Sequence, residues 1–214
     1  MPASRRRAFV RKYGPGLALL VLYYVGLTAY RDFRDNFFAE LLIALDFAGE
    51  PAMFTLTELP VAVFVLLLFA LTMYIRNNQR ALIIYCWIIL AGALVVGGST
   101  WAFQAGMLRG DWWLVLTGLG LFLGYVPFNA ILFDRLIAAL GSIATAGFLI
   151  YLADAAGYSG SIGVLLYKNF GSAELSWLSF FIGMSYVLAG MGVATLLGAI
   201  WYWRRQFAQI RATH

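Results

Sequence analysis

The amino-acid sequence predicts an all-α polytopic membrane protein, a single domain of six transmembrane helices spanning residues 1–214. Hydrophobic residues make up 63% of the chain and charged residues 12%, whereas soluble domains have about half and about a quarter. The mean hydropathy is +0.82. The apolar residues also fall into six runs separated by polar turns, and a helix of about 20 such residues crosses the hydrocarbon core of a bilayer.

The six runs cover residues 14–37, 59–76, 80–103, 112–133, 143–167 and 176–203. The first run follows a basic segment, Arg5 to Lys12, as a signal peptide would. No small-x-small cleavage site comes after it, so we expect a retained first helix. The loop behind it contains Glu40–Asp46, which predicts a short helix lying in the membrane interface.

Proline and glycine mark the second and fourth runs. We expect the second helix to open at Glu58-Leu59-Pro60, because proline is tolerated in the first turn of a helix. In the fourth run Pro127 is expected to kink the helix. The glycines of that run predict close helix packing; they are Gly118, Gly120 and Gly124.

The distribution of basic residues predicts that both termini are cytoplasmic, because cytoplasmic loops carry the excess of Lys and Arg. On the opposite side the topology places only Arg31, Arg34, Arg109 and Lys168. The cytoplasmic set is Arg5, Arg6, Arg7, Arg11, Lys12, Arg76, Arg80, Arg135, Arg204, Arg205 and Arg211.

Several classes of function are not expected. The net charge is +5, but the basic residues flank apolar runs instead of forming a patch with aromatic residues, so nucleic acid is not a predicted partner. Cys86 is the only cysteine and His214 the only histidine. Without a histidine pair, a nucleophile motif or paired carboxylates, we predict no enzyme activity, no metal and no cofactor.

Asp154 is the first candidate for function, because it is the only charged residue between Arg135 and Lys168. A carboxylate near the middle of a bilayer is costly unless it faces the bundle interior, is paired or is protonated. Tyr151 and Tyr158 lie at helical spacing on either side of it. Such a residue can bind and release a proton during transport. The alternative is a structural Asp that satisfies backbone N–H groups at a helix break near Gly157.

The first helix has a polar face made by Tyr24, Thr28, Arg31 and Asp35, which are spaced by four, three and four residues. Arg34 points elsewhere and is expected to reach a neighbouring helix. These side chains either line a water-filled cavity, with Arg31 or Arg34 binding an anionic solute or pairing with Asp154, or form a solvated helix end.

One further polar residue lies in the fourth run. Asn129 is expected either to contact a solute or to form a hydrogen bond between helices.

Five stretches resemble an uncharacterised group of bacterial major-facilitator-like membrane proteins, catalogued as a domain of unknown function. They are TAYRDFRDNF, FTLTELP, LGYVPFNAILFDRLIA, FLIYLADAAGY and GVLLYKNFG. The resemblance covers about residues 15–200 and corresponds to the C-terminal six-helix half of full members, which resemble twelve-helix transporters. It implies a fold like one half of a major facilitator and a location in the bacterial inner membrane.

Together these observations predict a half-size secondary transporter of a small polar or anionic solute, and coupling to protons is a further hypothesis. A single bundle supplies one wall of a transport site, so the expected partners are the lipid bilayer, the solute, and either a second copy or a separate N-terminal half. Two alternatives stay open: a membrane scaffold that transports nothing, and an incomplete fragment of a twelve-helix protein.

Overall fold

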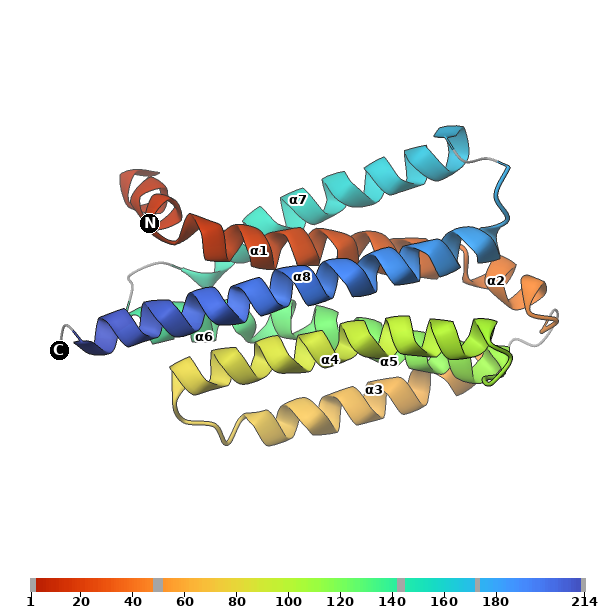
Figure 1. Cartoon of the computed structure of the whole chain (residues 1–214), viewed down its shortest axis with the longest axis horizontal. Helices are drawn as coiled ribbons and strands as arrows, with labels where there is room; N and C mark the ends of the chain where they lie inside the picture. Colours follow the sequence, from red (N-terminus) through yellow and green to blue (C-terminus); the bar gives the residue numbers. More distant parts are fainter. Residues whose placement is uncertain (1–2, 48–51, 142–144, 172–173, 213–214) are drawn as a thin grey trace.

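A computed structural model describes residues 3–47, 52–141, 145–171 and 174–212 (Figure 1). Within these segments the chain is almost entirely helical and contains no strand. Six helices are long and apolar enough to cross a membrane, which confirms the prediction of a six-span helical protein. Helices suit this role because every backbone polar group in their interior is satisfied within the helix.

The six spans are α1, α3, α4, α5, α7 and α8, and two short helices accompany them. The bounds are α1 Ala3–Asn36, α2 Phe38–Ala44, α3 Ala52–Thr72, α4 Asn78–Gln104, α5 Gly110–Ala130, α6 Leu132–Leu140, α7 Ala146–Leu166 and α8 Trp177–Ala212, with a π-helical turn at Tyr167–Gly171.

Several helices begin or end at residues other than the limits of the apolar runs. Helices α1 and α8 continue into their basic ends, because Arg and Lys are good helix formers and need not enter the hydrocarbon. The short helix that was expected in the loop after the first span is present as α2. Helix α3 begins at Ala52, so Pro60 lies inside it and not in its first turn. The expected start of the fifth span, residue 143, lies outside the described residues.

The fourth apolar run is not one helix. Helix α5 ends at Ala130, and Ile131 leaves helical geometry with φ −141° and ψ −33°. Helix α6 then runs from Leu132 to Leu140 and is capped by Gly141, which adopts the left-handed conformation with φ 57°. Glycine suits such a helix end because it has no Cβ to strain the backbone.

The six spans form two layers. One layer has the order α7–α1–α5–α3, in which α1 contacts both α7 and α5, and α5 contacts α3. The second layer consists of α8 and α4, which pack on each other and cover α1 and α5. Figure 1 shows α7 and α3 along opposite edges, and both termini at the same end of the bundle. The outer helices α3 and α7 therefore have few neighbours.

Candidate functional site

Asp154 lies near the middle of α7, and its side chain faces α1. The hydroxyl of Tyr24 donates a hydrogen bond of 2.5 Å to its Oδ1 atom. Tyr24 is itself buried, and Asp154 is half-buried. A short hydrogen bond from a phenol to a carboxylate is strong because the acceptor carries charge. The carboxylate therefore has a hydrogen-bond partner on the neighbouring helix α1.

Tyr24 also connects α7 to α5. Its hydroxyl oxygen lies 3.2 Å from Oδ1 of Asn129 on α5. A phenol has one proton, which the shorter contact assigns to Asp154. The Tyr24 ring stacks on that of Tyr125, with centroids 5.6 Å apart and an angle of 12° between the planes. One buried side chain of α1 thus joins functional groups from both neighbouring helices.

Arg31 lies two turns further along α1 and completes the arrangement. Its guanidinium donates to the hydroxyl of Tyr125 and lies over the same ring, 4.4 Å from the centroid. It also bonds the Asp32 carboxylate through Nη2 at 2.5 Å and Nε at 3.0 Å. Arg31 therefore pairs with Asp32, whereas the sequence suggested an anionic solute or Asp154 as its partner.

We call this set the polar cluster: Tyr24, Arg31, Asp32, Tyr125, Asn129 and Asp154. It forms a continuous series in which Asp154 contacts Tyr24, Tyr24 stacks on Tyr125, and Tyr125 contacts Arg31. The Arg31 and Asp32 side chains are each 19% exposed, and Asn129 is exposed. The cluster is therefore open on one side, on the face of the α7–α1–α5–α3 layer away from α4 and α8.

Small residues bring α7 close enough to α1 for this contact. A methyl group on Gly157 would lie 2.7 Å from Oγ1 of Thr28, closer than real contacts allow. A methyl group on Gly160, one turn later, would overlap Val25. The Thr28 hydroxyl meanwhile donates to the Tyr24 carbonyl at 2.9 Å. Thr28 therefore serves close packing beside the cluster and its hydroxyl is already used.

Arg34 does not reach Asp154. It is 1% exposed, and its Nη2 atom lies 2.6 Å from Oε1 of Glu58 on α3 and 3.3 Å from the Leu114 carbonyl on α5. Its guanidinium also lies over the Phe38 ring, 4.8 Å from the centroid. These contacts connect α1 to α3 and α5. The prediction that Arg34 reaches a neighbouring helix is confirmed, because its partner Glu58 lies on α3.

Three predicted residues lie at the margin of the cluster or beyond it. Tyr158 is 53% exposed and its phenol lies close to Arg31. Tyr151 is 77% exposed, because three residues turn the helix about 60° short of a full turn and carry it outward. Asp35 is exposed at the end of α1.

The sequence interpretation did not select Tyr125, Asp32 or Glu58 as site residues. Tyr125 precedes Asn129 by four residues and so shares its helix face, which was the available signal. Asp32 follows Arg31 directly, and neighbours in sequence point to different sides of a helix, so its pairing depends on the long guanidinium folding back. Nothing local marks Glu58 as the partner of Arg34.

The polar cluster combines two carboxylates, a guanidinium, two phenols and an amide. This chemistry suits a small polar solute: the guanidinium pairs with anions, while phenol and amide groups donate and accept hydrogen bonds. Among the described residues, no three His, Cys, Asp or Glu side chains gather as a metal site would require.

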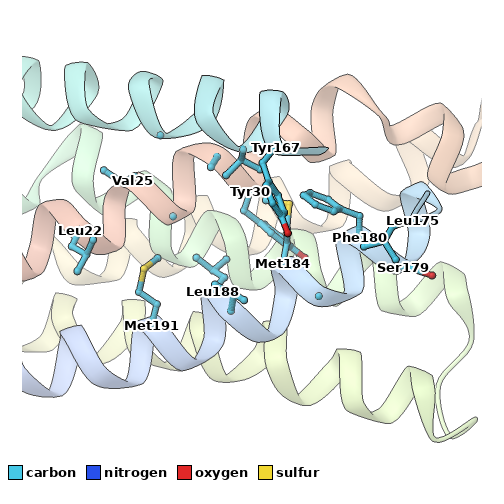
Figure 2. Close-up of a pocket in the computed structure, with 16 residues that line it drawn as sticks. Leu22, Val25, Tyr30, Tyr167, Leu175, Ser179, Phe180, Met184, Leu188 and Met191 are labelled. Atoms are coloured by element: carbon cyan, nitrogen blue, oxygen red, sulfur yellow. The ribbon is translucent and has the colours of Figure 1, made fainter. Parts of the chain in front are cut away.

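A separate cavity of about 530 Å³ lies between α1, α7 and α8. Figure 2 shows that Leu22, Met184, Leu188 and Met191 line it. The Tyr30 hydroxyl, which also belongs to the lining, shares a hydrogen bond of 2.8 Å with Ser185. Because the described lining is almost wholly apolar, this cavity suits hydrocarbon and not a charged solute.

Comparison with known proteins gives a family and nothing finer. No curated protein and no solved structure matches the chain. A family model matches residues 1–206, nearly the whole sequence. The chain therefore belongs to the family of unknown function DUF5690.

Proposed function

We propose that this chain is one six-helix half of a secondary transporter, with a fold like half of a major facilitator, which moves a small polar or anionic solute. The observation that carries the proposal is the hydrogen bond between Tyr24 and Asp154 inside apolar spans. Ionisable residues at such depth commonly mark solute or proton pathways.

The contacts of each side chain suggest its role in the proposed transport. Arg31 binds the anionic group of the solute, since its partner Asp32 leaves part of the guanidinium exposed. Asn129 and Tyr158 supply hydrogen bonds at the open face. Asp154 takes up a proton from water when its hydrogen bond to Tyr24 breaks. This step couples transport to the proton gradient. Tyr151 and Asp35 are exposed and act at the rim of the cluster.

The proposal is tested with purified protein in liposomes that contain a pH-sensitive dye, with small carboxylates, amino acids and sugar phosphates added outside. We expect one solute class to accelerate proton entry, and Asp154→Asn to reduce it by about tenfold or more, as the loss of one charged hydrogen bond allows. Asp134→Asn, an exposed acid of α6, is the matched control. Unchanged and pH-independent uptake by Asp154→Asn would remove this carboxylate from the mechanism.

We further propose that a second copy covers the polar cluster. Its open face would otherwise bring charges against lipid, at a cost of several kcal/mol. The flanking helices α3 and α7 are the natural contact surfaces, because each packs mainly on one other span.

Cross-linking tests this pairing in a Cys86→Ala background. Leu66→Cys on α3 and Ile162→Cys on α7 are expected to form intermolecular disulfides, since both positions are exposed. Leu94→Cys on α4 is equally exposed and is the control. Cross-linking at Leu94 alone would contradict the proposed interface and favour a scaffold assembled through the other layer.

A further inference from the structure

The basic end of the bundle contains a cavity whose side chains have no role in the polar cluster. It lies between the start of α4 and the end of α8 and has a volume of about 450 Å³. Three arginines line it: Arg80 from α4, and Arg204 and Arg211 from α8. The sequence explains arginines at this end by the positive-inside rule, but that rule does not require three of them to converge on one cavity.

Among the described residues, no carboxylate pairs with any of these three guanidiniums, whereas Arg31, Arg34 and Arg109 each pair with one. Arg211 donates only to the Phe207 carbonyl of its own helix, at 3.3 Å. By contrast, Arg135 at the same end donates to Asn78 at 2.8 Å. The cavity therefore carries three positive charges, and the partial positive charge at the N-terminus of α4 adds to them.

The cavity also has an apolar wall that continues toward the middle of the bundle. Trp87, seven residues into α4 from Arg80, lines it together with Ile84 and Phe207. Seven residues of helix span about 10 Å. An adjoining cavity shares Arg204 and is lined further up α8 by Leu197, Ile200 and Trp201. A ligand at the arginines thus meets apolar surface along both helices.

We infer that this cavity binds an anionic phospholipid, with the phosphate on Arg80, Arg204 and Arg211 and the acyl chains along Trp87 and Leu197. Basic pockets between membrane helices are suited to anionic headgroups, and arginine forms paired hydrogen bonds with phosphate. Tryptophan is favoured at the level of the headgroups. The layer of α4 and α8 faces away from the polar cluster, so the site is independent of the proposed transport function.

The test is a titration of delipidated protein in detergent with dioleoylphosphatidylglycerol, followed by native mass spectrometry. We expect saturable binding, and an apparent Kd raised about tenfold or more in the variant Arg80→Gln/Arg204→Gln/Arg211→Gln. The matched control is Arg7→Gln/Arg11→Gln/Arg76→Gln, which removes the same charge from arginines that are equally exposed at the same end but do not line the cavity. Its apparent Kd should stay within about threefold of the parent.

Two further arms identify the source of the phosphate. Dioleoylphosphatidylcholine should bind more weakly than phosphatidylglycerol, and inorganic phosphate should not compete at equal phosphate concentration. Competition by inorganic phosphate would make the cavity a site for a soluble anion and overturn the lipid assignment. An equal loss in both triple variants would show diffuse attraction and also overturn it. Melting without lipid checks folding, and Arg204→Gln alone replaces the triple variant if that variant does not fold.

Discussion

The α4–α5 contact and the α1–α7 contact both depend on glycine, but the two pairs of helices are surrounded by different chemistry. A methyl group on Gly120 of α5 would lie 2.5 Å from the Gly92 carbonyl oxygen of α4, and the reverse distance is the same. Around these glycines stand Val96 and Leu123. At Gly157 of α7 the nearest atom is instead the Thr28 hydroxyl, beside the polar cluster.

The two pairs also differ in how firmly the rest of the bundle holds them. About half of the most apolar stretch of α4 and α5 is buried, 50% and 56%, but only 22% of that of α7. Segments with few buried contacts open at lower free-energy cost. Packing of α4 on α5 therefore stabilises the bundle, whereas packing of α7 on α1 positions Asp154 on a helix that has few other contacts.

The largest effect is expected from breaking the stabilising pair. Gly120→Val should lower the free energy of unfolding by about 3 kcal/mol, because the new side chain meets backbone that cannot move aside. Unfolding by SDS in mixed micelles, followed by circular dichroism, measures this. Gly98→Ala, on α4 with open space around it, should be neutral or slightly stabilising. Equal loss in both variants would show that the close approach of Gly120 to Gly92 is not the cause, and would contradict the stabilising role of this contact.

A second change addresses the connection between the two regions, since Arg34 of α1 also contacts α5. Glu58→Gln should destabilise the protein by about 2 kcal/mol by leaving a buried guanidinium unpaired; Glu58 is itself 38% exposed, so solvent screening keeps the loss below that of a fully buried pair. Glu174→Gln removes an exposed glutamate as the control. An unchanged free energy of unfolding in Glu58→Gln would mean that water hydrogen-bonds to the Arg34 guanidinium in place of the carboxylate.

The third change tests the positioning pair. Gly157→Ala should be about 1 kcal/mol less stable than Gly163→Ala, because both gain helix propensity but only the former meets a neighbour. It should also lengthen the Tyr24–Asp154 contact and reduce solute-driven proton uptake. Normal uptake by Gly157→Ala would separate helix approach from function and contradict the positioning role of this glycine.

The smallest effect on stability is expected within the polar cluster. Tyr125→Phe keeps the ring that stacks on Tyr24 but removes the hydroxyl that Arg31 contacts. The free energy of unfolding should fall by less than about 1 kcal/mol, while the transport KM for an anionic solute should rise a few-fold. Phe128→Leu, at a ring that packs on Tyr24 without a hydroxyl, should leave the KM unchanged. A larger stability loss than in Gly157→Ala would make Tyr125 structural.

Three features could be predicted from the amino-acid sequence alone: the six spans, the short helix near Glu40, and Asp154 as a candidate functional residue. Each depends on local quantities: run length, helical spacing and the cost of charge in hydrocarbon. These do not require knowledge of which helices are neighbours. The glycines of the fourth run were likewise readable as packing residues, although Gly118 proves to lie against Arg34 and not against another helix backbone.

Which side chains contact one another depends on how the helices pack, and this could not be predicted from the sequence. The link from Asp154 to Tyr24 joins residues 130 positions apart, and Arg31 reaches Tyr125 across 94. Spacing along a helix fixes a face but not the rotation of that helix against its neighbours, so Tyr151 was expected beside Asp154 and is exposed instead. Arg34 could be paired with Glu58 only once α3 lay beside it, because no local rule relates two charges on helices separated by a loop.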